Sequence, residues 1–86
     1  MMPPMSQFRR FDVRPLLARG VEPFPEVCKR TEALKDGEGL IVVAPFLPSP
    51  LVEKLNGEGF RSKVERGNGA DWIVFFGGRQ QTISDL

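Results

Sequence analysis

Cys28 is the only cysteine of the chain and its one soft nucleophile, and the sequence contains no histidine. A thiol can carry sulfur as a persulfide where a helix N-terminus or a nearby cation favours its thiolate. Cys28 instead falls inside an expected helix, on one stripe with Phe24, Val27 and Leu34. Cysteines in such apolar stripes are usually inert core residues. We therefore expect Cys28 in the core, and a sulfur carrier that uses this thiol is the alternative.

The residue types that are missing exclude several kinds of site. Ser-His-Asp triads, histidine-based metal sites, zinc fingers and disulfide scaffolds need histidines or further cysteines, which the chain does not contain. We therefore expect no metal, no cofactor and no catalytic residues, and a protein that is not an enzyme.

The charge balance gives no general attraction to nucleic acid or to acidic membranes. Twelve basic residues face eleven acidic ones, for a formal net charge of +1. Arginines at positions 9, 10, 14 and 19 concentrate positive charge in the first quarter, so a weak nucleic-acid-binding module is a second alternative. No run approaches the roughly 20 apolar residues of a membrane span, and no signal-peptide stretch opens the sequence. We expect a cytoplasmic protein without a membrane partner.

Periodicity predicts the elements that must position any site. Alternation predicts a strand over residues 10–14, closed by Pro15 and followed by a loop over 16–22. Spacings of three and four predict a helix from Pro23 to about Lys35. The later elements are a strand over 40–44, a helix capped by Ser49 that starts at Pro50 and is ended by Asn56-Gly57, and strands over 60–65 and 72–76 joined by a hairpin connection.

The order βαβαββ predicts an α/β two-layer sandwich. Right-handed crossovers place both helices on one face of a four-stranded mixed sheet. We expect a single domain over residues 10–76, with a flexible arm at 1–9 and a frayed tail at 77–86. Because the apolar strand at 40–43 should lie mid-sheet with one face free of helices, a homodimer is one way to cover it.

Two loops that follow strands carry the candidate binding residues, because ligands tend to bind at the carboxyl ends of strands in α/β sheets. Glu22 can stabilise the helix N-terminus, or it can line a pocket beside the arginines. Phe46 and Leu47 can fill the gap between sheet and helix, or form an exposed docking patch held rigid by prolines. The candidate residues are Arg14, Arg19, Glu22, Phe24, Pro45 and Phe46.

Several short segments occur at fixed spacing along most of the chain. They are residues 12–20, Glu22-Pro23-Phe24, Ala44-Pro45-Phe46 with Pro48, Pro50 and Leu51, Gly59-Phe60, and Trp72. In this order they resemble a family of uncharacterised bacterial proteins related to the TusA/SirA sulfur carriers. The resemblance runs from about Arg10 to Phe76 and implies the same βαβαββ sandwich.

The TusA/SirA carriers begin their first helix with a Cys-Pro-x-Pro motif whose cysteine carries the sulfur. The corresponding positions here are Gly20, Val21, Glu22 and Pro23. The second proline is present and the cysteine is not. The resemblance therefore implies a TusA-like protein without the usual thiol. We expect a non-catalytic binding or interaction module that uses the two loops to hold an unidentified protein or small ligand.

Overall fold

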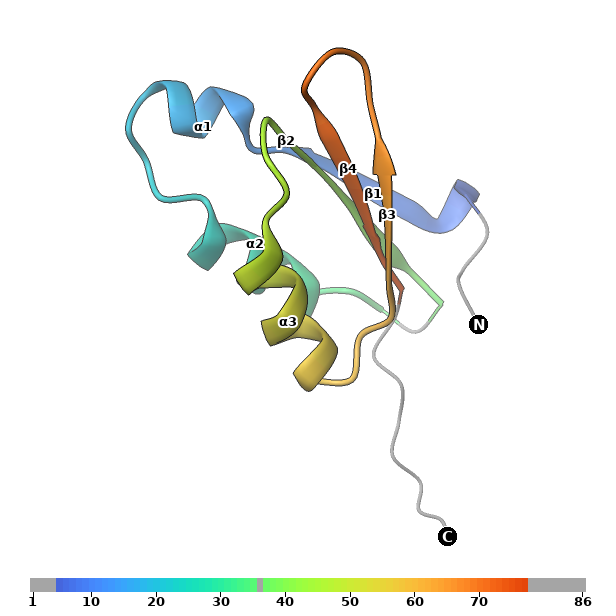
Figure 1. The fold of residues 1–86 in the computed structure, drawn as a ribbon. Coiled ribbons are helices and arrows are strands. Elements are labelled where there is room, and N and C mark those ends of the chain that lie inside the picture. Colours follow the sequence, from blue (N-terminus) through green and yellow to red (C-terminus); the bar gives the residue numbers. More distant parts are fainter. Residues whose placement is uncertain (1–4, 36, 78–86) are drawn as a thin grey trace, which may run out of the picture.

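The structure, a computed structural model, describes residues 5–35 and 37–77. Within these ranges the elements are η1 (Met5–Gln7), β1 (Phe8–Asp12), α1 (Arg14–Ala18), α2 (Phe24–Glu32), β2 (Gly39–Ala44), α3 (Ser49–Gly57), β3 (Ser62–Arg66) and β4 (Trp72–Phe76) (Figure 1). The first strand thus begins at Phe8, inside the segment expected to be an arm. The rest of that arm, residues 1–4, and nearly all of the expected tail, residues 78–86, lie outside the described residues.

The strands form one four-stranded mixed sheet in the order β1-β2-β4-β3. β1 and β2 are parallel neighbours, and β4 pairs antiparallel with both β2 and β3. Because β4 lies between β2 and β3, the crossover through α3 steps over one strand position. The expected four-stranded mixed sheet with helices, a two-layer sandwich, is confirmed.

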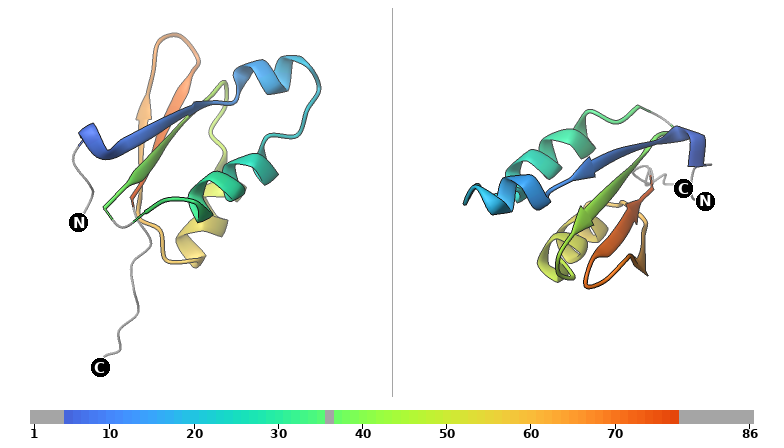
Figure 2. Two further views of the ribbon diagram at one scale, coloured as in Figure 1. Left: turned by 180° about the vertical axis from the view of Figure 1, so that it is seen from behind. Right: turned by 90° about the horizontal axis from the view of Figure 1, so that it is seen from above.

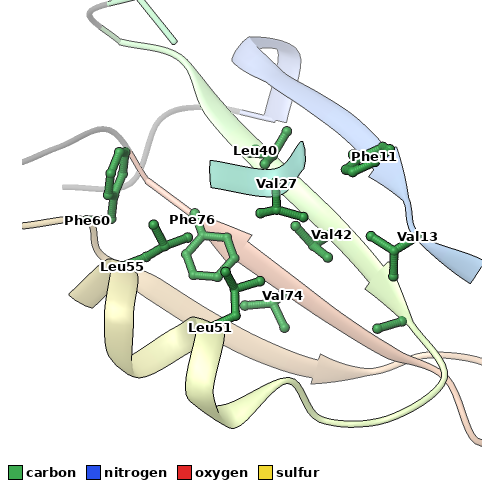
Figure 3. Packing of buried hydrophobic residues seen from close by; sticks show 11 residues of the cluster. Phe11, Val13, Val27, Leu40, Val42, Leu51, Leu55, Phe60, Val74 and Phe76 are labelled. Atoms are coloured by element: carbon green, nitrogen blue, oxygen red, sulfur yellow. The ribbon is translucent and has the colours of Figure 1, made fainter. Parts of the chain in front are cut away.

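The helices α2 and α3 cover one face of this sheet (Figure 2). Val27 of α2 and Leu55 of α3 are completely buried. They pack in one cluster with the inward side chains of β2 and β4, such as Val42 and Phe76 (Figure 3). The stripe expected for the first long helix is therefore the one that packs, since i, i+3 and i+4 positions share a helix face.

A short helix, α1, forms where the sequence predicted the end of a strand and a loop. β1 stops at Asp12, and Arg14 is the first residue of α1 rather than the last residue of a strand. Pro15 fits the first helical turn, where backbone amides have no partner within the helix. The Asp12 carboxylate accepts a hydrogen bond from the Arg14 amide (3.0 Å), and Leu16 and Leu17 pack against the core. The local hydrogen bond to Asp12 and the core packing of the two leucines thus convert the expected loop into a helical turn.

Gly20 ends this turn with a left-handed backbone (φ +75°), and its amide donates to the carbonyl of Leu17 (3.0 Å). We expect Gly20→Ala to lower the free energy of unfolding by about 1 kcal/mol, because an L side chain is strained at this φ. Urea unfolding measures the change.

Gly57→Ala is the matched control, since Gly57 is helical, has no positive φ and has open space around its Cα. Alanine there should stabilise the protein by up to about 1 kcal/mol. Shifts of the same sign in both variants would contradict the assigned backbone of Gly20.

Candidate functional site

Arg14 joins the carboxyl end of β1 to the start of β4. Its Nε and Nη2 donate to the two carboxylate oxygens of Asp12 (2.8 and 2.6 Å). Its Nη1 donates to Oδ2 of Asp71, the residue just before β4 (2.5 Å). The fork of the guanidinium suits this bidentate arrangement. Arg14 therefore clamps two strands that are distant in sequence.

The clamp also shifts the pKa values of Asp12 and Arg14. The side-chain hydrogen bond from Arg14 holds the pKa of Asp12 below its usual value, although partial burial acts against this. The same hydrogen bond raises the pKa of Arg14. Arg14, expected to be a binding residue, is thus already engaged by two carboxylates of its own chain. A ligand anion would have to compete with both.

The end of α1, the loop after it and the start of α2 contain three more candidate residues, Arg19, Glu22 and Phe24. Arg19 is exposed at the end of α1. Glu22 is exposed, and its Oε1 accepts a hydrogen bond from the Phe24 amide (3.3 Å), so it contacts the helix start as one of its two expected roles required. Phe24 is half-buried and packs against the core. Val21, which the sequence analysis did not select, is 43% exposed.

The loop between β2 and α3 carries an apolar surface. Phe46 and Leu47 are 42% and 40% exposed, Pro45 beside them is exposed, and Pro48 is buried. Of the two expected arrangements, these side chains adopt the exposed one. Both loops lie at the end of the sheet where β1 and β2 terminate (Figure 1). We call Phe46 and Leu47 the loop patch.

Cys28 lies on α2 as its fifth residue, away from the helix N-terminus. It is half-buried and packs against the hydrophobic core. Lys54 of α3 lies near it. The pKa of Lys54 is raised mainly by its hydrogen bond to Glu58, and the nearby Cys28 adds a smaller effect.

Most of the arginines near the first strand are engaged within the chain. Arg9 pairs with Glu38 (3.2 Å), and Arg30 lies over the ring of Phe11, 4.0 Å from its centroid. Arg66 stacks on Trp72 in the same way, at 4.4 Å. Arg9 and Arg14 are thus paired with carboxylates of their own chain, which leaves fewer free cations for a phosphate backbone.

Residues 5–35 and 37–77 contain neither a cluster of metal-ligating residues nor a membrane-spanning helix. No group of three or more histidine, cysteine, aspartate or glutamate residues there could hold a metal ion. The longest helices of this part, α2 and α3, have nine residues each, and none of its helices is long and apolar enough to cross a membrane.

The chain matches the family described as "Uncharacterized conserved protein (DUF2249)" over residues 10–77, which is well over half of its length. The protein belongs to this family. Comparisons with curated proteins and with solved structures gave no significant match.

The sequence analysis found both loops but missed three residues that matter at this end of the sheet. Asp12 and Asp71 hold Arg14, and Val21 is an exposed apolar side chain on the loop between α1 and α2. Val21 stood in the segment compared with Cys-Pro-x-Pro, so it could have been noticed as an apolar residue in a polar loop. Nothing in the spacing connects Asp71 to Arg14, because the two are 57 residues apart.

The clamp makes stability depend on pH. Because the folded pKa of Asp12 lies below the unfolded value of 3.8, its ion pair stabilises the fold above that pH and is lost as pH falls through the folded pKa. Asp12→Asn should lower the free energy of unfolding by about 1 to 2 kcal/mol at pH 7, since the group is partly exposed. The difference from the wild type should shrink below about pH 4.

Urea unfolding of both proteins between pH 7 and pH 2.5 measures this difference. Glu53→Gln, which removes an exposed carboxylate from α3, controls for the change in net charge. A wild-type advantage that stays constant over the whole range would contradict the ionic clamp.

Proposed function

We propose that this protein is a non-catalytic interaction module whose loop patch docks another protein. The exposure of Phe46 and Leu47 carries the proposal. Apolar side chains that are exposed next to each other mark interaction sites more often than apolar residues scattered singly over a surface. The proposal also places the protein in the cytoplasm. A second version of the proposal is that Arg19 and Glu22 bind a small ligand.

The prolines around the patch support a docking role. Pro45, Pro48 and Pro50 restrict the backbone on both sides of Phe46 and Leu47. A surface that is rigid before binding loses little conformational entropy when a partner arrives. The Arg14 clamp supports the same end of the sheet by joining β1, α1 and the start of β4.

We further propose that the family is related to the TusA/SirA carriers, and that its members dock partner proteins but no longer transfer sulfur. The segment from Gly20 to Pro23 directly precedes α2, as the Cys-Pro-x-Pro motif precedes the first helix of those carriers. Gly20 has a positive φ that a cysteine would adopt only with strain. Restoring the thiol at this position would therefore need a change of backbone as well as of side chain.

Replacing Phe46 with a photo-crosslinking phenylalanine derivative, in the protein expressed in its native cells, tests the proposal. A discrete crosslinked partner should appear after irradiation, and Phe46→Ala in the purified protein should weaken binding of that partner at least tenfold. Phe46→Ala should change the free energy of unfolding by less than about 1 kcal/mol, because the side chain is already 42% exposed.

The matched control is the same crosslinker at Val64, which is 39% exposed on β3, away from both loops. The same crosslinked species from both positions would point to nonspecific contact and contradict the proposal. A large fall in stability of Phe46→Ala would return Phe46 to a core role.

The sulfur-carrier alternative is tested by the reactivity of Cys28. Because this side chain packs against the core, an alkylating reagent should label it at least about tenfold more slowly in the native protein than in the urea-unfolded chain. Intact mass over time measures both rates. Equal rates would show an accessible thiol and would favour the sulfur carrier over the interaction module.

A nucleic-acid-binding module is the weaker alternative. Such a module predicts binding that falls steeply with added salt. The internal ion pairs of Arg9 and Arg14 weigh against it, because they leave fewer free cations for phosphates.

A further inference from the structure

The sheet has a second face, turned away from α2 and α3, which no described helix covers (Figure 2). Strand register assigns its members, because alternate residues of a strand point to opposite faces and paired residues share a face. One row across the four strands is Arg10, Ile41, Phe75 and Lys63, and the next is Asp12, Val43, Ile73 and Glu65. We call these two rows, together with Phe8, the open face.

The centre of the open face is apolar and even. Ile41, Ile73 and Phe75 are half-buried there, and Val43 in the second row is buried, with 3% of its surface exposed. Phe8 packs edge-on against Phe75, with ring centroids 5.6 Å apart. Gly39 allows this contact, since a Cβ at that position would lie 2.7 Å from Cδ1 of Phe8 and 2.8 Å from the carbonyl oxygen of Phe76. The missing side chain lets the Phe8 ring lie across β2.

The charges of the open face lie at its two edges in an ordered pattern. The first row ends in a basic residue on each edge, Arg10 on β1 and Lys63 on β3. The second row ends in an acidic residue on each edge, Asp12 and Glu65. The Nζ of Lys63 lies 3.3 Å from Oε2 of Glu65, and both side chains remain exposed. The side chain of Asp12, which is paired with Arg14, is 31% exposed. All of these groups can accept a further partner.

This pattern is complementary to itself under only one of two symmetries. A two-fold axis between stacked sheets can run along the strands or across them. An axis along the strands would exchange the two edges, so that Arg10 faces a lysine and Asp12 faces a glutamate. An axis that runs across the strands, between the two rows, places each edge strand opposite the same strand of the second copy. It also places the first row of one copy opposite the second row of the other. Basic groups then face acidic groups at both edges, and apolar side chains face apolar ones between them.

We propose that the open face binds a second copy of this chain around a two-fold axis that runs across the strands. Arg10 then faces the partner's Asp12, and Lys63 faces the partner's Glu65. Each pair occurs twice, because the interface is symmetric. The arrangement stacks two sheets with nearly aligned strands, a common packing of sheets, in which faces lie about 10 Å apart. This inference is independent of the loop patch, which lies at one end of the sheet.

The size of the open face sets the expected affinity. Four strands at a spacing of about 4.8 Å and five residues at a rise of about 3.4 Å give a face of about 19 by 17 Å. This is about 320 Å² per chain, below the roughly 800 Å² per partner of a standard specific interface. We therefore expect a weak, reversible dimer that forms only at high protein concentration.

Sedimentation equilibrium of the full chain over a wide concentration range tests the dimer. The wild type should pass from monomer to dimer as its concentration rises. Lys63→Glu should weaken the dimer at least tenfold, because the new carboxylate faces the partner's Glu65. Glu65→Lys should weaken it as well, since two ammonium groups then face each other. Both positions are exposed, so neither variant should disturb the fold.

Mixing the two variants gives the sharpest result. In a mixed dimer the carboxylates of one chain face the ammonium groups of the other at both positions, so association should return to near the wild-type level. Lys54→Glu, the same change on α3 in the helix layer, is the matched control and should leave the dimer unchanged.

A chain that stays monomeric up to millimolar concentration would overturn the proposal, because another occupant would then have to cover the open face. A dimer whose dissociation constant is unchanged by Lys63→Glu would show that the interface lies elsewhere. A dimer strengthened by Lys63→Glu would assign the axis along the strands, since Arg10 would then face a carboxylate.

Discussion

The need to shield β2 on both faces organises the whole structure. This strand is the most apolar of the sheet, and its neighbours β1 and β4 satisfy its backbone groups on either side. Leu40, Val42 and Ala44 point to the helices, where α2 and α3 bury them. Ile41 and Val43 point the other way. The helix layer shields one face of β2, and on the other face Val43 is buried while Ile41 remains half-buried.

Local pattern predicted the elements wherever a segment was long enough to show a period. The helix expected from Pro23 to about Lys35 is α2, and the strand expected over 40–44 is β2 within one residue. α1 could not be predicted in this way, because five residues show no helical period. It forms through a local hydrogen bond from the Arg14 amide to the carboxylate of Asp12, and through the packing of two leucines on the core, which only the folded chain provides.

The position of the candidate site could be predicted from the sequence, but the exposure and the contacts of its side chains could not. Strand ends and prolines located both loops, since those signals are local. Whether Phe46 turns inward or outward depends on how closely α3 approaches the sheet, and no single segment encodes that. In the same way, Arg14 resembles a free cation in the sequence, and its role as a clamp appears only when Asp71 is brought to it.

The position of β4 between β2 and β3 bears on how the protein is made. β4 follows every other strand in the sequence, yet it supplies two of the three strand pairings of the sheet. During synthesis, β1, α2 and β2 can meet early, but β3 has no neighbour until Trp72–Phe76 has left the ribosome. The sheet should therefore be completed late and in one step. Because its strand pairings join residues distant in sequence, folding should be slower than that of helical domains of this size. Chaperones that recognise exposed apolar strands would meet β2 in that interval.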